Sequence, residues 1–109
     1  MVDESIVLIV RQYLNNLRNQ GLPITYGVIF GSQAEGKADR WSDIDLLVIS
    51  PRFDQPQKRS DINVLWRVAA RTDSRIEPIP VGQLQYQNDA TSTIIEVARR
   101  EGQVIPLAD

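Results

Sequence analysis

The sequence contains no cysteine and no histidine, and these two absences remove whole classes of chemistry. Without cysteine the chain forms no disulfide, offers no thiolate nucleophile and cannot build a zinc or iron–sulfur site on cysteine ligands. Without histidine it lacks the commonest general base, the imidazole metal ligand and the central residue of a Ser-His-Asp triad. Any chemistry must therefore use carboxylates, hydroxyls, lysine, arginine and backbone amides. A bound metal would be a hard, oxygen-preferring ion such as Mg²⁺ or Mn²⁺.

The sequence also lacks a basic excess and a long apolar run. Its 12 Lys and Arg stand against 14 Asp and Glu, a net charge of −2, which argues against general nucleic-acid binding but leaves room for a local phosphate site. No apolar stretch reaches the length of a membrane span, and two acids precede the first apolar run, unlike a signal peptide. We therefore expect a cytoplasmic protein with no membrane association. A length of 109 residues, 42% of them apolar, predicts one domain over residues 1–109.

Hydrophobic periodicity predicts helices and strands that alternate along the chain. Helices are expected over residues 4–19, from an N-cap at Ser60 to residue 71, and over 88–101, with room for one short helix in the polar stretch 31–41. Strands are expected over residues 25–30, 43–49 and 75–81, and a short one over 104–107. Because Pro78 and Pro80 cannot donate ladder hydrogen bonds, the third strand is expected at an edge of the sheet. The class is therefore α/β or α+β with a small sheet.

Two aspartates at the start of the second strand carry the strongest chemical signal. Asp43 and Asp45 are two residues apart, so on a strand their carboxylates point to one face. A divalent cation would relieve their repulsion, and two ions about 4 Å apart sharing such a pair can support phosphoryl displacement. Gly31 and Ser32 follow the preceding strand, where glycine lets a phosphate approach free backbone N–H groups and the hydroxyl adds a donor. Taken alone, a Gly-Ser pair is most often part of a turn, and an Asp-x-Asp pair is most often a solvated turn or a helix cap. Their order and spacing, together with the apolar strands before and after them, favour a phosphate and metal site instead.

The segment GSQAEGKADRWSDIDLLV resembles the signature of the DNA polymerase beta-like nucleotidyltransferases, and in particular of their minimal nucleotidyltransferase (MNT) domains. The similarity is close over residues 26–49 and looser to residue 81. It implies the polymerase beta palm-like fold, a small mixed sheet with helices packed on one face. It also implies transfer of a nucleoside monophosphate, AMP from ATP, with Asp43 and Asp45 holding Mg²⁺ or Mn²⁺ and Gly31 and Ser32 positioning the triphosphate.

The resemblance further implies a third acid on a neighbouring strand, for which Glu77 is the candidate and Asp73 the alternative. Glu77 would ligate the catalytic metal and help to deprotonate the acceptor hydroxyl, although many relatives carry Asp there. The loop departs from the family as well, because Glu35 stands where many relatives have a basic residue. Lys37 and Arg40 are the candidates for the missing positive charge. In the same loop, Asp39 is assigned to the loop itself, and Ser42 is expected to hydrogen-bond locally and fix the turn.

Relatives of this size imply that the acceptor is a separate helical protein of the HEPN type. In such toxin–antitoxin pairs the MNT protein is the antitoxin and transfers AMP to a tyrosine of the toxin. The alternation of side chains along the second and third strands also predicts an apolar patch below the acids, formed by Leu47, Ile49, Ile79 and Val81. With the helices on the opposite face, this patch should be open, and we expect a second copy or a partner protein to cover it. Two alternative functions remain: a non-catalytic nucleotide-binding subunit, and transfer to a small molecule as in antibiotic nucleotidyltransferases.

Overall fold

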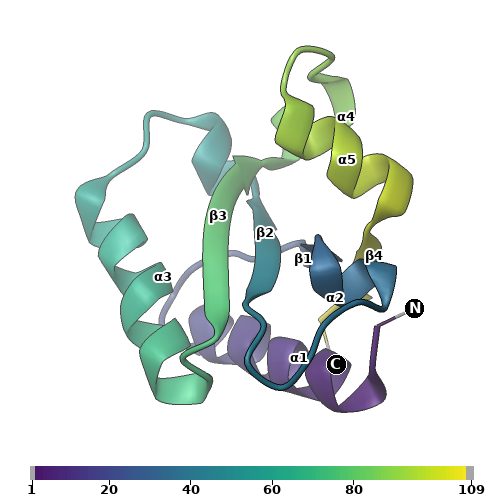
Figure 1. The fold of residues 1–109 in the computed structure, drawn as a ribbon. Helices are drawn as coiled ribbons and strands as arrows, with labels where there is room; N and C mark the ends of the chain where they lie inside the picture. Colours follow the sequence, from purple (N-terminus) through teal and green to yellow (C-terminus); the bar gives the residue numbers. More distant parts are fainter. Residues whose placement is uncertain (1, 108–109) are drawn as a thin grey trace.

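The computed structural model describes residues 2–107, which form a four-stranded sheet with helices packed against it (Figure 1). The elements follow in the order α1 (Glu4–Asn19), β1 (Tyr26–Phe30), α2 (Ser32–Glu35), β2 (Ile44–Ser50), the 3₁₀-helix η1 (Pro51–Asp54), α3 (Arg59–Thr72), β3 (Ile76–Gly82), α4 (Gln83–Asn88), α5 (Thr93–Glu101) and β4 (Gln103–Pro106). This arrangement confirms the predicted α+β class. Within residues 2–107, every helix is too short or too polar to span a membrane.

The sheet is mixed and has the strand order β3-β2-β1-β4. Strand β1 pairs antiparallel with β2 and with β4, whereas β2 and β3 are parallel. The two-proline strand β3 has only β2 beside it, which confirms the edge position expected from Pro78 and Pro80. The parallel register places Asp45 opposite Glu77.

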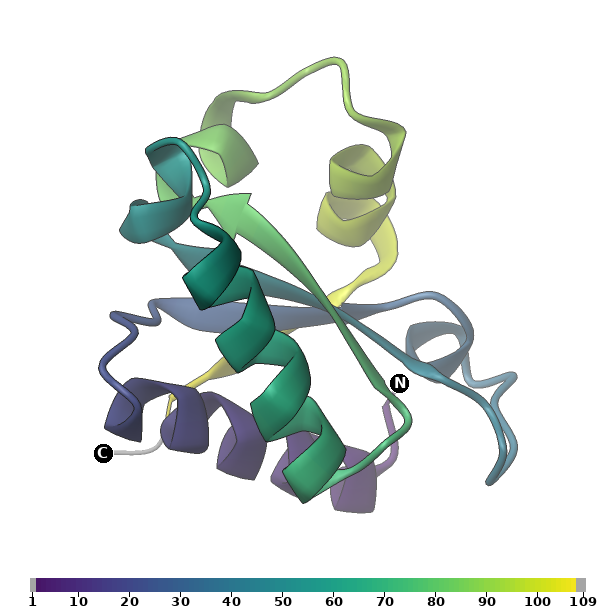
Figure 2. The ribbon, with the colours of Figure 1, turned by 90° about the vertical axis from the view of Figure 1, so that its left-hand side faces the viewer.

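The two faces of the sheet carry separate apolar clusters. Helices α1 and α3 pack on one face, where the fully buried Tyr13 donates its hydroxyl to the carbonyl of Leu65, 2.9 Å away. Helix α5 packs on the other face through Ile95 and Ala98 (Figure 2). In Figure 2 the sheet separates α1, below it, from α4 and α5, above it. The core therefore has two layers, one on each face of the sheet.

The apolar patch predicted below the acids is covered, which corrects the expectation that it is open. Leu47 and Ile49 are fully buried and Val81 is 3% exposed, because α5 crosses this face and the ring of Tyr86 packs beside it. Ile79 is half-buried in the same cluster. The chain itself covers these residues, so the patch gives no reason to expect a second copy or a partner.

Two helix boundaries also differ from the prediction. The segment expected as one helix over residues 88–101 contains the end of α4, a turn in which Asp89 accepts from the N–H groups of Thr91 and Ser92, and then α5. Ser92 is the N-cap of α5. Helix α3 begins after Lys58 without a side-chain cap, so Ser60 lies inside the helix.

Candidate functional site

Three acidic residues lie at the end of the sheet where β2 and β3 begin. Asp45 is the second residue of β2 and is paired in register with Glu77 of β3, while Asp43 immediately precedes β2. Asp43 and Glu77 are exposed and Asp45 is half-buried. The parallel pairing of β2 and β3 thus brings together residues that are more than thirty positions apart in the sequence.

These carboxyl groups change one another's protonation. Partial burial raises the pKa of Asp45, and the charge of Asp43 raises it further, while a hydrogen bond with Glu77 acts in the opposite direction. Loss of water around the carboxyl raises the pKa of Glu77, and the charges of Asp43 and Asp45 and hydrogen bonds to both raise it further. Within residues 2–107, the ion pairs with Lys or Arg involve other acids. The cluster therefore carries an excess of negative charge that a cation would relieve.

Gly31 brings the end of β1 against this cluster. Its φ of 74° and ψ of −150° belong to a backbone region that is essentially restricted to glycine. A Cβ atom at this position would collide with the carboxylate of Asp45. Because Gly31 has no side chain, α2 can start directly beside Asp45, with the half-exposed Ser32 as its first residue. The Gly-Ser pair and the acids are thus neighbours, as their order in the sequence suggested.

The loop between α2 and β2 is shaped by its own hydrogen bonds. The backbone N–H of Asp39 donates to the Ser42 hydroxyl at 3.0 Å, and that hydroxyl lies 3.2 Å from the Asp39 carboxylate. The same carboxylate accepts from the N–H of Trp41 at 2.8 Å. The predicted local role of Ser42 and the assignment of Asp39 to the loop are therefore confirmed.

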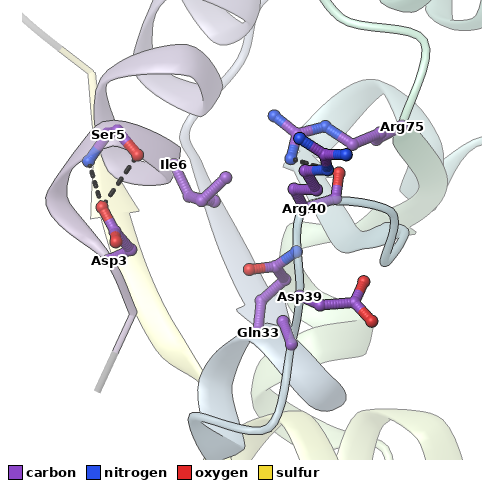
Figure 3. Close-up of a pocket in the computed structure, with 8 residues that line it drawn as sticks. Asp3, Ser5, Ile6, Gln33, Asp39, Arg40 and Arg75 are labelled. Carbon is purple, nitrogen blue, oxygen red and sulfur yellow. Dashed lines mark hydrogen bonds between the residues drawn. The ribbon is translucent and has the colours of Figure 1, made fainter.

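The basic candidates Lys37 and Arg40 make contacts with the loop and with α2. The guanidinium of Arg40 stacks on the ring of Trp41 at 4.8 Å. Arg40 also lines a pocket of about 290 Å³ between the start of α1 and the loop, with Arg75 and Asp39 (Figure 3). Lys37 is exposed, and its backbone N–H donates to the carbonyl of Ser32.

Asp73 is engaged elsewhere. Two hydrogen bonds, of 3.1 and 2.8 Å, join its carboxylate to the Arg75 guanidinium and lower the pKa of Asp73. This position precedes β3, as expected, and leaves Glu77 as the acid beside Asp45.

Gln33 is a residue of this region that the sequence analysis did not single out. Its side chain is only 6% exposed, and its amide nitrogen lies 3.3 Å from the carbonyl oxygen of Asp43 and 3.4 Å from that of Ser42. A single glutamine in a polar segment gives no sign of such a role, because its partners are nine and ten residues away. Gln33 joins the helix that follows the Gly-Ser pair to the residue that carries the first aspartate.

The three acids offer carboxylate oxygens, which are the donors that Mg²⁺ and Mn²⁺ prefer. The raised pKa values of Asp45 and Glu77 agree with a site where a cation would offset the negative charge. Within residues 2–107, however, no three acidic side chains already stand as a closed set of metal ligands. The donor chemistry of the three acids therefore fits a divalent cation.

The sheet and its acid cluster define the class of protein: a small α+β domain in which carboxylates lie beside a short helix that follows a glycine. The sequence model of the nucleotidyltransferase domain family matches residues 10–97. The chain belongs to this family. No curated protein matches the sequence.

Solved structures with low sequence identity share the fold. A candidate nucleotidyltransferase from Sulfolobus solfataricus aligns with a TM-score of 0.64 at 15% identity, over 90% of this chain and 77% of that one. A chain of a toxin–antitoxin structure with AMP-PNP aligns with a TM-score of 0.59 at 18% identity, over 91% of this chain and 74% of that one. A chain of the complex of the tri-AMPylated Shewanella oneidensis HEPN toxin with its MNT antitoxin gives 0.55 at 14% identity, over 94% and 73%. These likenesses concern the fold.

Proposed function

We propose that the protein is an MNT-type nucleotidyltransferase that moves a nucleoside monophosphate, AMP from ATP, to a hydroxyl group of a partner protein. The observation that carries this proposal is the register of the parallel strands, which sets Asp45 opposite Glu77 and beside Gly31. Membership of the nucleotidyltransferase family supports the reaction class. The likeness to chains of an MNT–HEPN complex and of a toxin–antitoxin structure with AMP-PNP supports a HEPN-type partner and an adenine nucleotide.

In this proposal each part of the site has one task. Asp43, Asp45 and Glu77 would hold Mg²⁺ or Mn²⁺, which when bound neutralises phosphate charge and lowers the pKa of a coordinated hydroxyl. Gly31 lets the start of α2 lie directly beside the acids, and the hydroxyl of Ser32 would donate to a phosphate held there. The acceptor oxygen then bonds to the α-phosphorus as the bond to the bridging oxygen breaks and pyrophosphate leaves.

Glu77 is suited to hold a proton during this reaction. In the protein without a bound cation, loss of water around its carboxyl group and the charges of Asp43 and Asp45 raise the pKa of Glu77. A raised pKa brings a carboxyl group closer to the neutral pH at which a general base works best. In this proposal Glu77 accepts the proton released by the acceptor hydroxyl. Lys37 and Arg40 are proposed to supply positive charge to the triphosphate or the outgoing pyrophosphate, and in this structure the Arg40 guanidinium lies against Trp41.

A labelling experiment tests the proposal. The protein is incubated with α-labelled ATP and Mg²⁺ or Mn²⁺, together with the product of a neighbouring gene or a native lysate. Label on a partner protein that disappears in Asp43→Asn and Asp45→Asn, but persists in Glu4→Gln, supports the proposal. Glu4 is a matched control because it is an exposed acid in the first turn of α1.

Other results assign another function. Nucleotide binding without transfer under either metal would identify a non-catalytic subunit, and label on a small molecule would identify an antibiotic-type transferase. If neither nucleotide nor metal raises the melting temperature, the proposed site is wrong, because a ligand that binds only the folded state must stabilise it.

A further inference from the structure

Asp43 is the acid of the cluster whose position the sheet does not fix. Strand β2 begins one residue later, at Ile44, whose N–H donates to the carbonyl of Arg75 at 2.8 Å. Asp45 is held by its pairing in register with Glu77, but Asp43 has no partner in that register. The place of its carboxylate therefore depends on the loop that precedes it.

At the start of this loop the N–H of Lys37 donates to the carbonyl of Ser32, whereas the hydrogen bonds around Asp39 only give the loop its shape and do not attach its far end, at Asp43, to α2. The bonds of Asp39 with Trp41 and Ser42 all stay within the loop. On its other side, Arg75 reaches the carbonyl of Arg40 at 3.4 Å and links the loop to the segment before β3. A different contact must relate Asp43 to α2.

Gln33 supplies that contact. It is the second residue of α2, two positions after Gly31, and the burial of its side chain limits the rotamers it can adopt. Its amide nitrogen carries two hydrogens, and two carbonyl oxygens, those of Ser42 and Asp43, lie within 3.4 Å. Figure 3 shows Gln33 at the base of the pocket beside the loop that carries Asp39 and Arg40. The Gln33 side chain thus contacts the two peptide carbonyl groups on either side of the Cα atom of Asp43.

We propose that Gln33 is a positioning residue that fixes the main chain of Asp43 relative to Gly31 and Asp45, and so sets the site for a divalent cation and the phosphates of a nucleotide. The inference rests on the proposed function and deepens it. Partners that orient metal ligands typically change metal affinity by about 10-fold to 100-fold when they are removed.

The test compares Gln33→Met with a matched control, Gln83→Met. Methionine keeps the length and much of the volume of glutamine but donates no hydrogen bond. Gln83 accepts from the Thr25 hydroxyl at 2.7 Å and is the first residue of α4, at the other end of β3 from Glu77. Binding of Mn²⁺ alone is followed by the electron paramagnetic resonance signal of the free ion, and hydrogen exchange is measured at the amide of Ile44.

In folded Gln33→Met we expect Mn²⁺ affinity to fall by about tenfold or more and exchange at Ile44 to accelerate, with both unchanged in Gln83→Met. A Mn²⁺ affinity within twofold of the wild type would overturn the proposal. If Gln33→Met does not fold, Gln33→Glu makes the same comparison, because a carboxylate cannot donate to the two carbonyls.

If neither variant folds, the wild-type protein decides. During a Mg²⁺ titration the side-chain amide signals of Gln33 should shift together with the backbone amide of Asp43, and stationary Gln33 signals would overturn the proposal. The two proposals fail differently. Mn²⁺ binding by the wild type without nucleotidyl transfer refutes the proposed function alone, whereas unchanged binding in the Gln33 variants refutes the positioning role alone.

Discussion

Replacing Gly31 with alanine should destabilise the protein far more than the same replacement at Gly36, five residues later. Both glycines have positive φ, 74° and 71°, but their surroundings differ. At Gly36 the backbone is left-handed helical with ψ 20°, and a Cβ atom would meet open space. Alanine there costs only the backbone conformation, about 1–2 kcal/mol.

At Gly31 two costs add. The backbone conformation, with ψ −150°, costs a non-glycine residue about 1–3 kcal/mol. In addition, the new Cβ would displace the carboxylate of Asp45 from its place beside Glu77. Overpacking of this kind adds about 1–3 kcal/mol, so the two costs together are about 2–6 kcal/mol. For a chain of this size, each kcal/mol lowers Tm by roughly 4–8 °C.

Thermal and urea unfolding, followed by far-ultraviolet circular dichroism in metal-free buffer, measures both variants. The loss of Tm should be about 4–16 °C for Gly36→Ala and roughly two to three times as large for Gly31→Ala. A double-mutant cycle with Asp45→Ala isolates the contact, because the second change removes the carboxylate that the new Cβ strikes. Equal losses for the two glycines, or a cycle without coupling, would refute the close approach of Gly31 to Asp45.

Three further predictions concern the scaffold. Tyr13→Phe should cost about 1 kcal/mol in urea unfolding, because it removes a buried 2.9 Å hydrogen bond to Leu65 that joins α1 to α3. Asp73→Asn should destabilise the protein near neutral pH but not in strong acid. Arg75 lowers the pKa of Asp73 from 3.8, so the ionised carboxylate stabilises the folded state above that value, and this stabilisation is lost as the pH falls through the lower pKa of the folded state. Urea unfolding at about pH 7 and at about pH 2 measures the difference. Ile95→Ala should lower the free energy of unfolding by about 2–5 kcal/mol, because the Ile95 side chain of α5 is only 2% exposed and packs against the sheet. A smaller loss would contradict this packing.

Local signals predicted most of the elements. Asp3 accepts from the N–H of Ser5 and caps α1, whose bounds agree with the periodicity. The edge place of β3 follows from the two prolines of that strand, which leave its outer side without ladder donors. The meeting of Glu77 with Asp45 needed one assumption from the resemblance, that the third acid lies on a neighbouring strand, and the register agrees with it.

The start of α4 was missed because it depends on a distant part of the chain. Helix α4 begins directly after β3 because Asp54, thirty residues earlier, accepts from the N–H groups of Leu84 and Gln85. The sequence of residues 83–88 does not predict that Asp54 caps this helix. The break at Asp89, by contrast, had a local signal, since an Asp with Thr two and Ser three residues later is typical of a turn that starts a new helix.

Because α5 covers the second face of the sheet, a partner can reach the candidate site only from another side. The sequence placed the partner on the apolar patch below the acids, but Ile95 and Ala98 of α5 occupy that face. The end of the sheet where Asp43 and Glu77 lie exposed is the part of the candidate site that remains accessible from solvent. If the proposed function is correct, an acceptor hydroxyl would approach along the exposed ends of β2 and β3, beside the loop that precedes Asp43. Contact with a partner would then depend on polar and charged groups around the acids more than on burial of a large apolar surface, and its strength should fall as salt concentration rises.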